Sequence, residues 1–341
     1  MSGGATTVDL VAESSKAGAL GSLGAAYMTP SQIVDAARAI KERTNRPFMI
    51  NIFAPLPEPG TFDAAPMLRR MGGFHKELGL PVPELPDGAA SQEKLFYEQL
   101  DAVFETGVPI FSFTFGIPPK DAMQRLKKAG MVIIGTATNV EEARMVEAAG
   151  CDAIIAQGSE AGGHRGTFNG PHETGMIGTL ALVPQIAGVV SIPVIAAGGI
   201  MDGRGIVASL ALGAEAAALG TAFLVSDESG IPDAHKARIV AAHDDDIVMT
   251  RAFSGRHARG IANRFVREVE ASPDEILPYP VQNKLTRAMR TAAGAQGNAE
   301  FLSLWSGQAP RLARPMSVAG LVRLLVEETR AELRKINAIE I

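Results

Sequence analysis

The sequence predicts an α/β fold of the TIM (β/α)8-barrel type. Short apolar runs alternate with amphipathic helical segments from one end of the chain to the other, which is typical of βα units that build a parallel sheet. Glycine is frequent, with 36 residues, and aromatic residues make up only 5% of the chain. This balance favours parallel strands joined by tight turns over an aromatic-cored sandwich, and 341 residues are enough for one barrel with insertions.

Seven apolar runs have the length and continuity of strands that are buried on both faces. We expect these strands at 19–24, 48–53, 110–115, 131–135, 152–156, 193–197 and 216–219. Helices are expected between them: Thr29-Pro30-Ser31 begins one, Asn139 caps another, and Gly130 and Gly150 stand where helices end. Seven strands are one fewer than a closed eightfold barrel needs.

Two long segments interrupt this alternation. Residues 55–90 hold seven prolines and follow the strand that contains Asn51, a connection far longer than a usual βα loop. We expect this insertion over the carboxyl ends of the strands, where barrels hold their active sites. Residues 247–315 contain Arg- and Pro-rich stretches, and a helix with one apolar face is expected at 317–337. The expected parts are therefore a barrel at 1–246 that includes the 55–90 insertion, a cap at 247–315 and a closing helix within 316–341.

Charge, cysteine content and hydropathy exclude several classes of protein. The net charge of -5 provides no basic field for a phosphate backbone, so nucleic acid is not an expected partner. The single cysteine, Cys151, cannot form an intrachain disulfide or a Cys-based zinc site, which fits a reducing compartment. The chain has no apolar run of about 18 residues, and its N-terminus lacks a secretory pattern. We therefore expect a cytoplasmic protein without a membrane partner.

The segment that follows the 152–156 strand carries the strongest local signal. It reads Gln157-Gly158-Ser159-Glu160-Ala161-Gly162-Gly163-His164-Arg165-Gly166. Its four glycines let a ligand approach the backbone, and they surround one histidine at the catalytic end of the barrel. A solvated glycine-rich loop is the alternative interpretation. A metal site at Glu160 and His164 is disfavoured because the intervening glycines oppose a helix, and Cys151 lies at the far end of its strand.

Two glycine turns follow the last two expected strands. They read Ala196-Ala197-Gly198-Gly199-Ile200 and Ala218-Leu219-Gly220-Thr221. Loops at these places are the usual phosphate site of the barrel fold, because backbone N–H groups and a helix N-terminus favour an anion. Asp202 is expected to cap the next helix, which leaves Gly199 free to face a phosphate. Glycines that serve only the turns are the alternative, and a dinucleotide-binding fold is disfavoured because no GxGxxG motif follows a first strand.

Taken in order along the chain, these segments resemble the class I nitronate monooxygenases, formerly called 2-nitropropane dioxygenases. The resemblance spans essentially the whole chain and rests on the stretches at 21–27, 46–55, 157–166, 196–199, 218–221, 278–283 and 304–308. The segment through His164 is its most specific part, whereas the glycine turns alone also suit other FMN barrels.

The resemblance implies non-covalently bound FMN and the oxidation of alkyl nitronates, such as propionate 3-nitronate, by O2 to a carbonyl compound and nitrite. It implies that His164 is the active-site histidine. It further implies flavin contacts from Asn51, Gln157 and Gly162, and a phosphate site at Gly199 and at Ala218, Leu219, Gly220 and Thr221. One departure is Ala218, where the family usually has glutamine. A backbone contact survives that change, and a side-chain contact does not.

The negative charge of a nitronate indicates which groups could bind it. Arg165, Lys284 or a protonated His164 could draw the anion toward the flavin, although each charge taken alone is more readily interpreted as a solvated surface group. Imidazole titrates near neutral pH, so His164 is also a candidate base for the α-proton of a neutral nitroalkane.

Two other functions fit the same scaffold. An NAD(P)H-dependent FMN reductase, of the quinone or enoyl-acyl-carrier type, would keep the glycine turns and change the substrate side. A non-catalytic flavin-binding barrel is the third interpretation, and the complete loop around His164 argues against it. The sequence leaves the physiological substrate and the oligomeric state open.

The start of the sequence predicts an incomplete barrel. The chain reaches a predicted helix near Thr7 without a preceding strand, and in the resembling family an apolar strand ending in Ala-Pro-Met comes before this point. Met1 falls where that final methionine belongs. We therefore expect the first strand to be encoded upstream, and the 19–24 strand to lack a normal neighbour on one side. The alternative is that another segment, such as 247–250, fills the gap.

Overall fold

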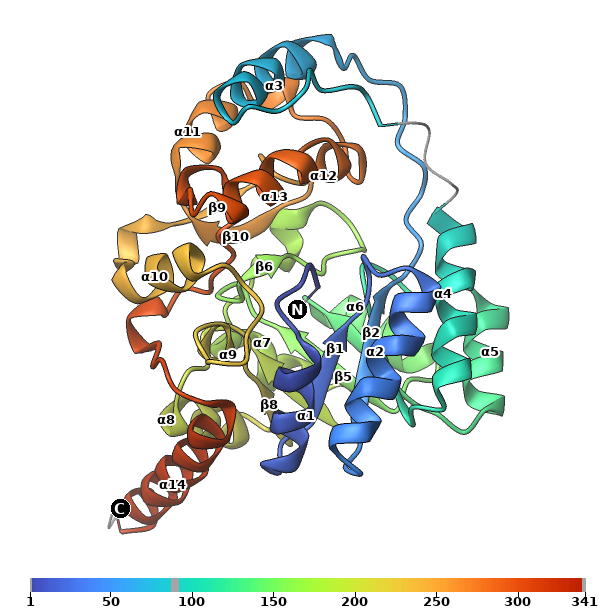
Figure 1. The fold of residues 1–341 in the computed structure, drawn as a ribbon. Coiled ribbons are helices and arrows are strands. Elements are labelled where there is room, and N and C mark those ends of the chain that lie inside the picture. Colours follow the sequence, from blue (N-terminus) through green and yellow to red (C-terminus); the bar gives the residue numbers. More distant parts are fainter. Residues whose placement is uncertain (1, 87–91, 339–341) are drawn as a thin grey trace.

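A computed structural model describes residues 2–86 and 92–338 of the chain, and its centre is a curled parallel sheet (Figure 1). Seven strands of the described residues form this sheet, in the order β1-β2-β3-β4-β5-β7-β8. They are β1 (Gly21–Gly24), β2 (Phe48–Phe53), β3 (Ile110–Thr114), β4 (Val132–Ala137), β5 (Ala153–Gln157), β7 (Val194–Ala197) and β8 (Ala216–Ala218). All seven predicted strands are confirmed, with ends that shift by at most two residues. The predicted α/β barrel-type fold is confirmed as well.

The sheet does not close between its two outer strands. β1 pairs with β2 on one side, and on the other side its contact within the described residues is a single parallel bridge between Gly24 and Ser2. The expectation that this strand lacks a normal neighbour is therefore confirmed. The alternative prediction, that residues 247–250 take the place of the missing strand, was wrong, because these residues pair in a different, antiparallel sheet. Met1 lies outside the described residues.

Helices cover the outer face of the sheet. They are α1 (Val8–Lys16), α2 (Pro30–Arg43), α4 (Gln92–Thr106), α5 (Lys120–Lys128), α6 (Val140–Ala148), α7 (Thr179–Ala187) and α8 (Gly203–Ala211). The predicted helix signals hold: Thr29 forms a capping box with Gln32, and Asn139 and Asp202 accept N-terminal amides. Gly130 and Gly150 follow α5 and α6 with φ of 68° and 83°, a region that glycine enters without strain.

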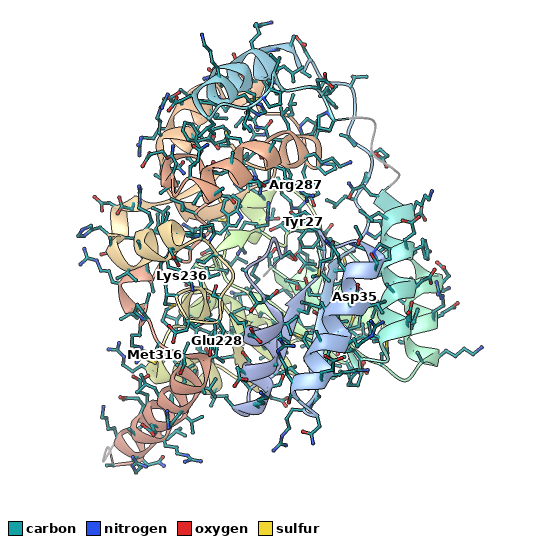
Figure 2. All side chains as sticks on the ribbon, viewed as in Figure 1. Tyr27, Asp35, Glu228, Lys236, Arg287 and Met316 are labelled. Atoms are coloured by element: carbon teal, nitrogen blue, oxygen red, sulfur yellow. The ribbon has the colours of Figure 1, made fainter. Side chains whose placement is uncertain are left out.

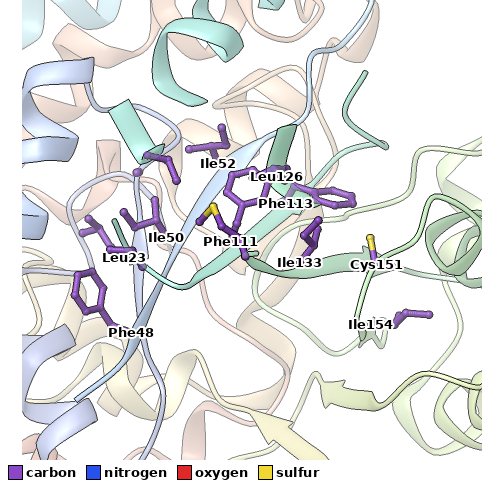
Figure 3. Packing of buried hydrophobic residues seen from close by; sticks show 14 of the residues in the cluster. Leu23, Phe48, Ile50, Ile52, Phe111, Phe113, Leu126, Ile133, Cys151 and Ile154 are labelled. Carbon is purple, nitrogen blue, oxygen red and sulfur yellow. The ribbon is translucent and has the colours of Figure 1, made fainter. Parts of the chain in front are cut away.

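The alternation of β2 separates the core from the interior of the barrel. Phe48, Ile50 and Ile52 are buried and pack with Phe111 and Phe113 in the cluster between sheet and helices (Figure 3). Because successive side chains of a strand point to opposite faces, the residues between them point inward. Met49, Asn51 and Phe53 accordingly line a cavity inside the barrel.

A second apolar cluster lies above the carboxyl ends of the strands. It contains residues of α3 (Ala65–Glu77), α10 (Asp233–Ala241), α11 (Arg264–Glu270), α12 (Val281–Leu285) and α13 (Arg287–Ala295). Phe74 of α3 stacks edge-on against Phe265 at 5.2 Å between ring centres. The predicted insertion over 55–90 therefore packs on the cap, and its residues 87–90 lie outside the described part.

An antiparallel sheet joins the cap to the barrel. β6 (Gly163–His164) pairs with β10 (Ala258–Ile261), which pairs with β9 (Ile247–Thr250). Short helices complete the chain: α9 (Thr221–Leu224) and 3-10 turns at His172–Gly175, Asp244–Asp246, Pro273–Glu275, Ala299–Phe301 and Pro310–Leu312.

The last helix, α14 (Val318–Asn337), packs on α1 and α8, and its end extends beyond the body of the protein (Figure 1). This element confirms the predicted closing helix. The division of the chain at 246 and 315 stays a prediction. Within the described ranges, no helix combines the length and the apolar character that a membrane crossing requires.

Candidate active site

A cavity of about 1090 Å³ opens at the carboxyl ends of the parallel strands. Its floor is formed by the ends of the strands and the loops after them, and its roof by α12, α13 and the segment around Trp305. This is the end at which barrel enzymes hold their active sites. All nine residues that the sequence proposed for the site line this cavity: Asn51, Gln157, Gly162, His164, Gly199, Ala218, Leu219, Gly220 and Thr221.

The loop after β5 is fixed by its own side chains. The amide of Gln157 donates to the carbonyl of His164 at 3.0 Å and accepts from the N–H of Gly166 at 2.7 Å. The carboxylate of Glu160 accepts from the N–H of Thr179 at 2.9 Å, at the start of α7. These bonds hold the loop in one course, so that it presents His164 to the cavity as part of β6.

Glycine is required at position 162 for a steric reason. A Cβ atom built on Gly162 would lie 2.6 Å from the backbone nitrogen of Gly307. That nitrogen donates to the hydroxyl of Thr221 at 2.9 Å. The loop after β5, the turn after β8 and the segment through Trp305 therefore meet backbone to backbone at one side of the cavity.

His164 is held between aromatic rings and one hydroxyl. Its Nε2 lies 2.8 Å from Oγ of Ser254, and its ring lies 5.4 to 6.2 Å from the rings of Trp305, Phe115 and Tyr279. Burial, with smaller effects from the Arg256 and Arg290 guanidinium groups, lowers the pKa of His164 to about 3. The imidazole is therefore neutral at neutral pH, and the expectation that a protonated His164 attracts the substrate does not hold.

Phe115 adopts a rare backbone conformation at the cavity wall. Its φ is 78°, in a region that bulky side chains seldom enter, and its ring carries the guanidinium of Arg256 at 4.2 Å. Strain of this kind persists where the surroundings impose it, and it is frequent at functional sites. Here it aims the ring at His164 and Tyr279.

A tyrosine and two arginines form the other side of the cavity. The guanidinium of Arg287 lies 5.7 Å from the ring centre of Tyr27, and the two side chains stand close together in Figure 2. The Tyr27 hydroxyl is buried beside the Tyr279 side chain, and burial raises the pKa of Tyr27. Arg290 donates to the carbonyl and side-chain oxygens of Asn283 at 2.7 and 3.0 Å. Burial lowers the pKa of Arg290 only to about 10, so it stays cationic at neutral pH.

Arg165 and Lys284, which the sequence suggested as anion-binding groups, do not line the cavity. Arg165 is 1% exposed, and its guanidinium donates to the carbonyls of Gly158, Gln157 and Gly175 at 2.6 to 2.8 Å. It anchors the loop and does not line the cavity. Lys284 is exposed and does not line the cavity. Sequence reasoning missed Arg287 and Arg290, although two arginines three positions apart fall on one face of a helix, here α13.

Two further residues of the site came from distant parts of the sequence. Ser254 reaches His164 from the segment before β10, ninety positions away in sequence. Tyr27 lies in the stretch at 21–27 that carried the family resemblance, yet nothing in its local sequence marks the hydroxyl as buried. Both contacts depend on tertiary packing, and no local pattern predicts them.

The glycine turns form a cradle that fits a phosphate. Gly198 and Gly199 have φ of 125° and 69°, which leaves the turn after β7 without side chains over the cavity. Asp202 caps α8 as predicted, accepting from the N–H groups of Arg204 and Gly205, so the backbone before it is not used by that carboxylate. The cavity also exceeds the usual size of a pocket for one small ligand, about 300–1,000 Å³, and therefore has room for a mononucleotide and a small substrate.

Comparisons with known proteins agree with this arrangement. The family model for nitronate monooxygenase matches residues 1–328. The chain is 43% identical over 332 residues to a protein named "Probable nitronate monooxygenase" from Staphylococcus saprophyticus, which covers 95% of this chain and 92% of that protein.

Among solved structures, the chain is similar to a nitroalkane oxidase from Streptomyces ansochromogenes, with a TM-score of 0.91 and 40% identity over 99% of this chain and 96% of the other. It is also similar to FabK from Thermotoga maritima, with a TM-score of 0.76 and 30% identity over 98% of this chain and 93% of the other.

Proposed function

The chain belongs to the nitronate monooxygenase family, and on this premise we propose that it oxidises alkyl nitronates, such as propionate 3-nitronate, with O2 to a carbonyl compound and nitrite. The observation that carries the proposal is the neutral, half-buried His164 in a cavity whose opposite side holds two arginines. A neutral imidazole suits proton abstraction, and the arginines suit an anionic substrate.

The cofactor that we propose is FMN. The backbone of Gly199 and of Gly220-Thr221 would hold its phosphate, while Asn51, Gln157 and Gly162 would contact the rest of the molecule. Ala218 would contribute only its backbone there. When bound, FMN would supply the redox chemistry by which O2 oxidises the substrate.

The substrate's charge would be met by the arginine side of the cavity. Arg287 is exposed and Arg290 is half-buried, so an entering anion would pass from a solvated cation toward a less solvated one. Tyr27 lines the same cavity, and its hydroxyl would donate to an oxygen of the same anion.

His164 would act on neutral nitroalkanes. The C–H bond at the α-carbon breaks, an N–H bond forms on the imidazole, and the electron pair moves into the C=N bond of the nitronate. A nitronate that is already ionised needs no such step. Substrate ionisation therefore separates the role of His164 from the role of the rest of the site.

An NAD(P)H-dependent FMN reductase remains the second candidate, because FabK from Thermotoga maritima shares the fold and 30% of the residues. Anaerobic mixing tests the two. NADH would bleach the flavin of a reductase, whereas the proposed monooxygenase would stay yellow with NADH and bleach with a nitronate. Flavin spectra before and after heat release would identify non-covalent FMN. A cytoplasmic location stays a prediction, which fractionation of the source cells would check.

A further inference from the structure

A short chain of hydrogen bonds connects His164 to the backbone of the cap. Nε2 of His164 lies 2.8 Å from Oγ of Ser254, and that hydroxyl donates to the carbonyl oxygen of Arg256 at 3.0 Å. The N–H of Arg256 donates back to the same hydroxyl at 3.3 Å. Ser254 is 0% exposed, so water does not compete for these bonds.

The number of hydrogens in this chain constrains their direction. A serine hydroxyl carries one hydrogen, and a carbonyl oxygen can only accept. The hydroxyl hydrogen of Ser254 can go either to the Arg256 carbonyl or to Nε2 of His164. Without it the Arg256 carbonyl would accept no hydrogen bond from the described residues, which favours donation to that carbonyl. The remaining bond, between Ser254 and His164, must then be donated by Nε2–H of the imidazole.

A neutral imidazole carries one hydrogen, so Nε2–H leaves Nδ1 with a free lone pair. No hydrogen bond of the described residues uses Nδ1, and His164 lines the cavity. We propose that Ser254 is a positioning residue that holds His164 as the Nε2–H tautomer, so that Nδ1 is the atom that accepts the α-proton of a neutral nitroalkane. The kinetic part of this proposal rests on the proposed function, and the tautomer does not.

The tautomer can be measured directly in the flavin-loaded protein. Long-range 1H–15N spectra of protein labelled with 15N-histidine distinguish a protonated from an unprotonated ring nitrogen, and the His164→Gln variant identifies the His164 signals. We expect a protonated Nε2 and an unprotonated Nδ1 near neutral pH. A protonated Nδ1, or a ring protonated on both nitrogens, would overturn the proposal. This measurement needs no Ser254 variant, so it decides even where such a variant does not fold.

Kinetics of Ser254→Ala provide the second test. The loss of one hydrogen bond should lower kcat/KM for neutral nitroethane by up to about tenfold, and should change kcat/KM for preformed ethyl nitronate by less than about twofold. Equal losses for both substrates would indicate a merely structural role and overturn the proposal.

A matched control is Ser226→Ala. Ser226 is also 0% exposed and also donates to a backbone carbonyl, that of Phe223 at 2.7 Å, but among the described residues its hydroxyl makes no hydrogen bond with His164. Its variant should leave the His164 signals and both kinetic constants unchanged. If the wild-type protein shows the Nε2–H tautomer but oxidises no nitronate, the positioning role of Ser254 stands and the proposed function fails.

Discussion

Gly162 and Gly307 meet backbone to backbone: a Cβ atom on Gly162 would come within 2.6 Å of the Gly307 nitrogen. Approaches this close do not occur between real Cβ atoms and backbone, so one of the two segments would have to move. The contact therefore couples the loop that presents His164 to the segment that donates to Thr221.

The first prediction is that Gly162→Ala displaces the segment around Gly307 and weakens flavin binding. The purified variant should carry less flavin per chain than the wild type, measured by absorbance after heat release. Gly60→Ala is the control, because Gly60 is exposed and a Cβ there meets nothing within 4 Å. Full flavin content in Gly162→Ala would show that the cofactor does not depend on this contact.

Much of this fold follows from local sequence. The strand predicted at 48–53 has the same bounds as β2. Thr29, Asn139 and Asp202 cap helices, as their residue types predict. These features depend on neighbours a few positions away. The same holds for the glycine turns, whose positive φ values at Gly198 and Gly199 follow from the fold's need for tight βα connections.

The site was harder to predict wherever it depends on contacts between distant segments. Arg165 has the charge expected of an anion-binding group, yet its guanidinium donates hydrogen bonds to three backbone carbonyls. Ser254 became part of the site only because β10 pairs with β6 and brings the cap beside His164. A local sequence pattern predicts neither the burial of Arg165 nor the pairing of β10 with β6.

The second prediction concerns the pH dependence of turnover. Since burial lowers the pKa of His164 to about 3, the base form is present from neutral pH down to that value. The value of kcat/KM for a neutral nitroalkane should therefore show no loss centred near 6.5, the usual pKa of histidine. A half-loss of activity near 6.5 that is absent in His164→Asn would contradict the low pKa.

The third prediction is that His164→Asn keeps the flavin but impairs turnover selectively. For neutral nitroalkanes the loss of a general base should cost on the order of a hundredfold in kcat/KM. Preformed nitronates, which need no proton abstraction, should be affected far less. Unchanged kinetics with both forms would remove His164 from the mechanism.

The fourth prediction is that Arg287→Gln raises KM for anionic nitronates by up to about fivefold and leaves KM for neutral nitroalkanes unchanged, because Arg287 is exposed at the rim and screened by solvent. The effect should shrink as salt is added. Lys284→Gln is the matched control, since this substitution also removes one positive charge, but from a side chain that does not line the cavity. Equal effects of both variants would indicate that the overall charge of the protein attracts the anion, and that Arg287 is not a binding group.

The fifth prediction links His235 to acid stability. Burial lowers the pKa of His235 to about 4, below its unfolded value of about 6.5, so the unfolded chain binds the proton more tightly. This residue's contribution to stability is therefore complete above pH 6.5 and is lost as pH falls toward 4, by at most about 1.4 kcal/mol per pH unit.

His235→Gln keeps a donor for the carbonyl of Trp305, which His235 Nε2 contacts at 3.1 Å, but cannot be protonated. The slope of Tm against pH between 6.5 and 4 should consequently be shallower in the variant than in the wild type. Parallel slopes would show that His235 titrates alike in both states.

Nitrite release tests nitronate oxidation by this chain most directly. The flavin-loaded wild-type protein is mixed with propionate 3-nitronate in air, and nitrite and O2 are followed together. We expect nitrite to appear while O2 is consumed, with no requirement for NADH, and we expect colourless Gly220→Val protein, whose phosphate cradle is blocked, to form none. Flavin-loaded protein that consumes no O2 and forms no nitrite with the nitronate, but is bleached by NADH, would contradict the proposed function.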